Sequence, residues 1–73
     1  MNNAQPKKKK AILDNWFSID LPDGGTCLAG IVTGHAHLRD GEEIYTSRVI
    51  RVIPNAGIAE TVNTLYVLGK PRK

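Results

Sequence analysis

The chain has 73 residues, 41% of them hydrophobic, and a formal net charge of +3, so it forms one domain whose folding buries only about 60% of the surface that the unfolded chain exposes. Its single cysteine, Cys27, excludes an internal disulfide and with it the stapled secreted scaffolds. No apolar segment follows the N-terminal lysines as in a secretory signal, and no run is long enough to span a membrane, so a cytoplasmic protein is expected.

The positive charge is confined to the two ends of the sequence. Residues 1–13 contain no acid and four lysines, which are Lys7, Lys8, Lys9 and Lys10. Residues 70–73 add three basic residues, whereas residues 14–69 hold seven acids against three arginines and are therefore acidic, with a net charge of −4. We predict a disordered basic arm over residues 1–11, a single small β domain over residues 12–69 and a flexible basic tail over residues 70–73.

The first half of the domain shows two strand signals. Residues 10–15 could form one short turn before the first strand. WFSIDL at 16–21 then alternates apolar and polar residues, which predicts a half-buried strand. The turn motif PDGG at 22–25 ends it. TCLAGIVTG at 26–34 is rich in β-branched residues and predicts a second strand, in which Gly30 indicates a bend or a close backbone approach.

The second half contains two longer apolar runs. They cover residues 43–53 and 58–68 and are separated by the turn signal PNAG at 54–57. Within the first of them, RVIRVI at 48–53 repeats with a period of three, whereas a strand requires two and a helix about 3.6. A β-bulge within the motif would insert an extra residue and change the face on which the following side chains lie.

No segment shows the periodicity and caps of a helix, so the fold is predicted to be all-β. Two short strands and two long, bent ones indicate a small SH3-like barrel or a strongly coiled four-stranded antiparallel meander. In either fold, Arg48 and Arg51 would point outward in different directions.

The residues that could carry chemistry do not form a catalytic site. His35 and His37 in GHAH would share one face of a strand, but structural zinc needs four ligands, so solvated loop histidines are favoured over a metal site, and a pH-sensing role stays open. Cys27 lacks a recognisable base, and a small buried side chain is favoured over a nucleophile. The acids at 40–43 match no cation-binding loop. We predict no enzymatic activity, no cofactor and no metal.

Two binding surfaces are suggested by residue type. Aromatic side chains and arginine dominate protein–protein hot spots, and an acidic surface favours a basic partner. The predicted partner-binding residues are Trp16, Tyr45, Arg48, Arg51, Glu42 and Glu43. Clustered lysines could instead neutralise phosphates or only solubilise the chain. The nucleic-acid-binding residues in this alternative are Lys7, Lys8, Lys9, Lys10, Arg48 and Arg51.

The run LAGIVTGHAHLRDGEEIYTSRVIRV, with TVNTLYVLG after it, resembles a group of short bacterial and phage- or plasmid-associated proteins without established activity. The shared pattern is GxVxGH, DG, TS and NTxYxLG, within residues 28–69. The resemblance implies a compact domain in a mobile-element setting, inside the host cell, and implies no mechanism. We expect a non-catalytic accessory or inhibitor protein, such as one directed at host defence, that binds a protein partner or pairs with itself through a strand edge. The alternative is a nucleic-acid-binding SH3-like barrel whose basic tails contact phosphates.

Overall fold

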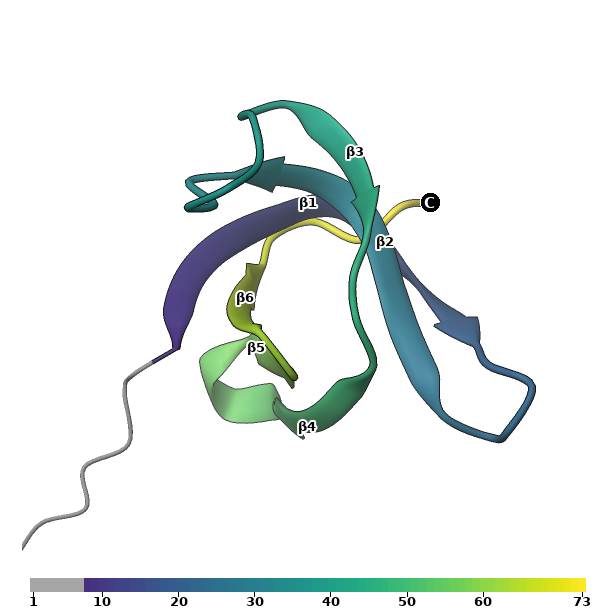
Figure 1. Ribbon diagram of the computed structural model, residues 1–73. Coiled ribbons are helices and arrows are strands. Elements are labelled where there is room, and N and C mark those ends of the chain that lie inside the picture. The colour runs from purple at the N-terminus through teal and green to yellow at the C-terminus, as the bar shows by residue number, and fades with distance from the viewer. Residues whose placement is uncertain (1–7) are drawn as a thin grey trace, which may run out of the picture.

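The computed structural model describes residues 8–73, which form a single curled β-sheet (Figure 1). Its strands are β1 (Lys9–Asp20), β2 (Thr26–Thr33), β3 (Glu42–Tyr45), β4 (Val49–Ile53), β5 (Ile58–Thr61) and β6 (Thr64–Leu68), with a 3-10 turn, η1 (Pro54–Ala56), before β5. The strand order is β3-β2-β1-β6-β5-β4, and only β1 and β6 run parallel. The all-β prediction is confirmed, with six strands in place of four. No helix within residues 8–73 has the length and apolarity to cross a membrane.

The sheet curls around a core but does not close. β3 and β4 stand at the two ends of the strand order, although only residues 46–48 separate them in sequence. At this connection the N–H of Thr46 donates to the Leu28 carbonyl (2.7 Å), and the Thr46 hydroxyl accepts from the Leu28 N–H (3.0 Å). The turn end of the β1–β2 hairpin projects away from the rest of the sheet (Figure 1). An opening therefore remains between β4 and the outer half of β2.

Each of the two long apolar runs is divided into two strands. The run at 43–53 breaks at residues 46–48, where Thr46 bonds to β2 as described. The run at 58–68 breaks at a tight turn in which the Thr64 N–H donates to Thr61 Oγ1 (3.2 Å) and the Thr61 hydroxyl donates to the Thr64 carbonyl (3.0 Å). The prediction of two continuous bent strands was wrong. At each interruption a threonine hydroxyl forms a hydrogen bond with the backbone, and the pattern of apolar residues gives no sign of these bonds.

The bulge predicted within RVIRVI is present. Val49 pairs with Thr61 and Arg51 with Glu60, so Ile50 is the additional residue in β4. Val49 packs against the core, whereas Ile50 is 53% exposed. The bulge thus places Val49 against the core and Ile50 at the surface, which explains how a strand can hold apolar residues with a period of three.

β1 starts earlier than predicted and contains a second bulge. Residues 10–15, expected to form a short turn, belong to the strand. The register with β2 shifts between Asp14 and Phe17, and Asn15 has a φ of 52°, a left-handed conformation that asparagine adopts more readily than most residues. As a result Trp16 packs against the core. The Cζ atom of Arg72 lies over the ring of Phe17, 4.2 Å from the ring centre.

The basic ends differ from the prediction wherever the structure describes them. Lys9 and Lys10 pair with Thr64 and Leu65 of β6, so residues 9–11 are part of the sheet and not of a disordered arm. The remainder of the predicted arm, including Lys7, lies outside the described residues.

Residues 70–72 lie against β1, although the sequence predicts a flexible tail over residues 70–73. The N–H of Lys70 donates to Asp14 Oδ1 (2.8 Å), and the N–H of Arg72 donates to the Trp16 carbonyl (2.8 Å). The C-terminal segment therefore continues along the bent strand beyond the end of β6.

The core is small and lies inside the curl. Its buried members are Ala11, Leu13, Leu28, Val32, Ala59 and Tyr66. Gly30 faces the bend of β1, and a Cβ at this position would lie 2.8 Å from the Asp14 carbonyl oxygen and 2.9 Å from Leu13 Cγ. The close backbone approach predicted for this glycine is confirmed.

Substitution of Gly30 tests this packing. We expect Gly30→Ala to lower the free energy of unfolding by about 1–3 kcal/mol, because the methyl group overpacks a site bounded by backbone. Thr33→Ala, on an exposed position of the same strand, should change it by no more than about 0.5 kcal/mol. Urea denaturation of the two variants measures the difference, and equal stabilities would contradict the packing.

Candidate interaction surface

The structure separates the six predicted partner-binding residues. Trp16 and Arg51 line one apolar groove beside β4. Tyr45 is 75% exposed and lines a different, polar hollow. Of the six, therefore, only Trp16 and Arg51 meet at one concave surface.

The acidic members of the predicted set lie apart from the groove. Glu42 and Glu43 are exposed on β3, at the opposite end of the strand order from β4. Glu43 Oε2 accepts a hydrogen bond from Arg72 Nη2 at 3.0 Å. The two acids of the predicted set therefore lie on a different strand from Arg51 and do not line the groove.

The apolar groove occupies the opening in the sheet and has a volume of about 420 Å³. In the described part of the chain, β4 pairs only with β5, so its other edge borders the opening. β3 covers β2 only over Ala29–Val32, which leaves the outer half of β2 without a strand on that side. The groove reaches the core at Leu28 and Ala59, and its walls include Trp16, Ile50 and Val52.

Trp16 forms a fixed wall of the groove. The bulge at Asn15 turns it toward the core, and its indole Nε1–H donates to the Gly69 carbonyl at 3.0 Å. A half-buried aromatic ring with its polar atom satisfied can offer its remaining apolar surface to a ligand at little entropic cost. Trp16, predicted as a partner-binding residue, therefore lines the groove while its ring also packs against core residues.

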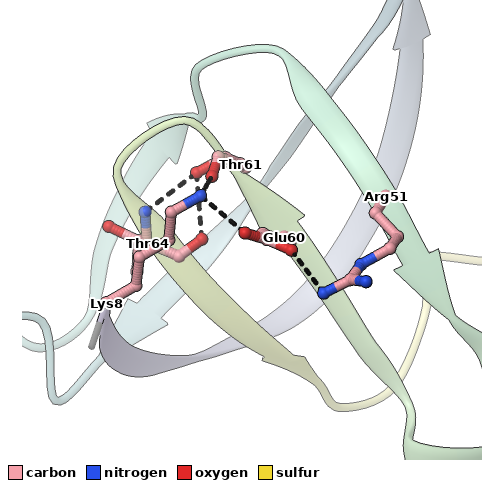
Figure 2. Close-up of polar contacts among 5 residues, drawn as sticks. All are labelled: Lys8, Arg51, Glu60, Thr61 and Thr64. Atoms are coloured by element: carbon pink, nitrogen blue, oxygen red, sulfur yellow. Dashed lines mark hydrogen bonds and ion pairs between the residues drawn. The ribbon is translucent and has the colours of Figure 1, made fainter. Parts of the chain in front are cut away.

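Arg51 belongs to a charge cluster at the side of the groove. Glu60 accepts hydrogen bonds from Lys8 Nζ (2.6 Å) and from Arg51 Nη2 (2.9 Å), and Lys8 Nζ also donates to the Thr61 carbonyl (2.9 Å; Figure 2). The Lys8 ammonium, with a smaller contribution from Arg51, holds the pKa of Glu60 below its usual 4.5 against the opposing effect of desolvation. Because one carboxylate is shared by two cations, one positive charge remains in excess beside β4.

Arg48 spans the opening. It precedes β4 and forms an ion pair with Asp23, which lies in the turn of the β1–β2 hairpin. The hydrogen bond from Arg48 holds the pKa of Asp23 below its usual value. Both side chains are exposed, and exposed ion pairs contribute little to stability because water screens them, so a ligand in the groove could displace this contact easily.

Most of the described residues in the predicted nucleic-acid-binding set are engaged by acidic side chains. Lys8, Arg48 and Arg51 are each engaged by a carboxylate. Lys9 lines the polar hollow, whereas its neighbour Lys10 does not. Lys7 lies outside the described residues. Of the five that the structure describes, three are therefore already paired with an acidic side chain.

The polar hollow was missed by sequence reasoning. It has a volume of about 570 Å³ and is lined by residues from four separated segments, including Lys9, His35, His37 and Asn63. His35 is half-buried and hydrogen-bonded, which differs from the solvated loop histidine that was favoured. Within residues 8–73 no three His, Cys, Asp or Glu side chains are placed to hold a metal ion, and Cys27 is buried.

The charge cluster around Glu60 predicts a pH-dependent stability. The pKa of Glu60 is lowered in the folded state, so the carboxylate stabilises the fold fully above its unfolded pKa and loses this effect as the pH falls through the folded value. We expect Glu60→Gln to be less stable than the unmodified protein at neutral pH, and the difference to shrink between about pH 5 and pH 3.

Glu42→Gln is the matched control for this experiment, because Glu42 is exposed and has no ion pair among residues 8–73. Its free energy of unfolding, measured by urea titration across the same pH range, should follow that of the unmodified protein. Identical pH profiles for the two variants would contradict the role given to Glu60.

The groove and the polar hollow are two concave features that could hold a partner or a ligand. Comparison of the chain with protein-family models, with curated proteins and with solved structures finds no match. What the protein binds must therefore be inferred from the chemistry of these two surfaces.

Proposed function

We propose that the protein is a non-catalytic interaction module that binds an extended segment of a partner protein in the groove beside β4. The observation that carries this proposal is an unpaired strand edge bordering an apolar groove, with Ile50 and Val52 each 53% exposed on that strand. A free edge presents backbone N–H and C=O groups to which a second chain can add as a strand. Apolar side chains at alternate positions of such a segment would enter the groove.

The charge beside the groove specifies the partner further. Arg51 shares Glu60 with Lys8, and its side chain is 65% exposed. A segment with a carboxylate opposite Arg51 would satisfy the excess positive charge. The bulge at Ile50 interrupts the regular ladder of β4, which restricts pairing to segments that fit the bend. The occupant we propose is therefore an apolar, extended segment that carries an acidic residue.

A second copy of the chain fits this groove less well. Arg51 is the central residue of β4 (Val49–Ile53), so two-fold antiparallel pairing of two β4 strands would bring the two Arg51 side chains close together. Like charges at facing positions destabilise a strand pair.

The ion pairs of Lys8, Arg48 and Arg51 likewise disfavour the nucleic-acid alternative on this face. An accessory or inhibitor role in the host cytoplasm, directed at a host protein, agrees with the resemblance to mobile-element proteins.

Selection of peptides from a random library against the immobilised protein tests the proposal. We expect the enriched peptides to alternate apolar residues and to contain Asp or Glu. Ile50→Asp should weaken the binding of a selected peptide by at least about tenfold. Arg51→Glu should shift the selection toward peptides with Lys or Arg. Val62→Asp is the matched control, because Val62 is 56% exposed but does not line the groove.

Three results would contradict the proposal. The first is a selection without sequence preference, and the second is equal weakening by Ile50→Asp and Val62→Asp. The third is a dimer in light scattering that Ile50→Asp dissociates, because the occupant would then be a second copy. Backbone N-methylation of the selected peptide at alternate residues should abolish binding, since strand addition needs the amide hydrogens.

A further inference from the structure

The polar hollow lies at a different place from the groove and has its own chemistry. Four parts of the chain line it: the start of β1, residues 35–38 between β2 and β3, residues 44–47 at the end of β3, and residues 63–66 around the β5–β6 turn. Its volume of about 570 Å³ lies within the range of roughly 300–1,000 Å³ that is typical of small-molecule sites.

Hydrogen-bond donors dominate the polar lining, and no carboxylate belongs to it. The lining contains the ammonium of Lys9, the imidazoles of His35 and His37, the hydroxyls of Ser47 and Thr64, and the amide of Asn63. Among residues 8–73, Lys9 forms no ion pair, so its positive charge is not neutralised by the protein. Such a lining favours an anion with several acceptor oxygens.

The donors are held in place by contacts within the protein. The N–H of His37 donates to His35 Nδ1 at 3.0 Å, so the neutral His35 ring carries its proton on Nε2, which lies 3.4 Å from Thr64 Oγ1. Asn63 Nδ2 donates to Ser47 Oγ at 3.3 Å. These contacts connect the loop that contains His35 and His37, the β5–β6 turn and the end of β3 around the hollow in the absence of a ligand.

Apolar and aromatic groups form the remaining wall. Leu38 and Ile44 pack against the core and also line the hollow. The rings of His35 and Tyr66 lie 6.3 Å apart, and those of His35 and His37 lie 6.1 Å apart. Tyr66 is only 4% exposed, so the accessible rings of the lining are His35, His37 and Tyr45. Their flat faces next to an anion site suit a planar ligand, because nucleobases stack on imidazole and phenol rings.

From these observations we infer that the hollow binds a nucleotide, with the phosphate near Lys9 and the base against the ring and aliphatic wall. The phosphate supplies the acceptor oxygens that the donors require, and the base supplies the planar apolar surface. The same chemistry is present in a free mononucleotide and in one unit of a single strand. A binding experiment has to distinguish these two sources.

Titration of isotope-labelled protein followed by ¹H–¹⁵N spectra tests the site directly. We expect adenosine 5′-monophosphate to shift the amide signals of residues 35–38, 44–47 and 63–66, and adenosine, which lacks the phosphate, to bind at least about tenfold more weakly. A tetranucleotide that binds more tightly than the mononucleotide would identify a single strand as the source, whereas equal or weaker binding would identify the free nucleotide.

Two lysine variants provide a matched comparison. Lys9→Gln and Lys10→Gln remove the same charge from neighbouring exposed positions at the start of β1, but only Lys9 lines the hollow. Lys9→Gln should weaken mononucleotide binding by at least about fivefold, while Lys10→Gln changes it by less than about twofold. Equal effects of the two variants, equal affinity for adenosine, or no shifts at millimolar mononucleotide would each overturn the inference.

Discussion

The bend of β1 at Asn15 and Trp16 determines where both concave surfaces lie. Before the bend, β1 is sandwiched between β2 and β6 and contributes Ala11 and Leu13 to the core. After the bend it pairs with β2 alone among the strands of the sheet, and its inner face continues with Trp16. One strand therefore supplies Lys9 to the polar hollow and Trp16 to the apolar groove. The groove stays open because β6 ends at Leu68, while the β1–β2 hairpin extends further.

The separation of charge along the sequence has an intramolecular explanation in the described residues. The basic ends neutralise the acidic body, since Lys8 pairs with Glu60 and Arg72 with Glu43. These contacts join positions far apart in sequence and connect Lys8 and Arg72 with the sheet. A basic end is therefore weak evidence for nucleic-acid binding unless it is known what its charges face in the folded chain.

The all-β class, the bulge in RVIRVI and the close approach at Gly30 could be predicted from the sequence, because each follows from a local pattern of apolar residues and glycine. The number of strands could not, for two different reasons. Thr46 ends one apolar run by bonding to Leu28, which is distant in sequence, whereas Thr61 ends the other through a local turn with Thr64 that the apolar pattern does not reveal. The docking of residues 70–72 was missed because it too depends on contacts distant in sequence. It rests on Asp14 and Phe17, which no local pattern connects with the C-terminus.

The candidate surfaces were predicted only in part. Trp16 and Arg51 were recognised as interaction residues by type, and the fold places both beside the groove. The polar hollow gave no linear signal because Lys9, His35 and Asn63 are brought together by the parallel pairing of β1 with β6 and by the loop after β2. The spacing of residues in a sequence shows which side chains share a face of one strand, whereas the hollow is lined by residues from several strands and loops.

Within residues 8–73, parallel pairing of β1 with β6 curls the sheet and leaves the outer side of β4 unpaired. Backbone nuclear Overhauser effects in the free protein measure this most directly. We predict cross-strand signals that connect residues 9–13 with 64–68, and no regular ladder of signals between residues 49–53 and 26–28. A continuous ladder of signals between these last two segments would show a closed barrel, and the groove on which the proposed function depends would not exist.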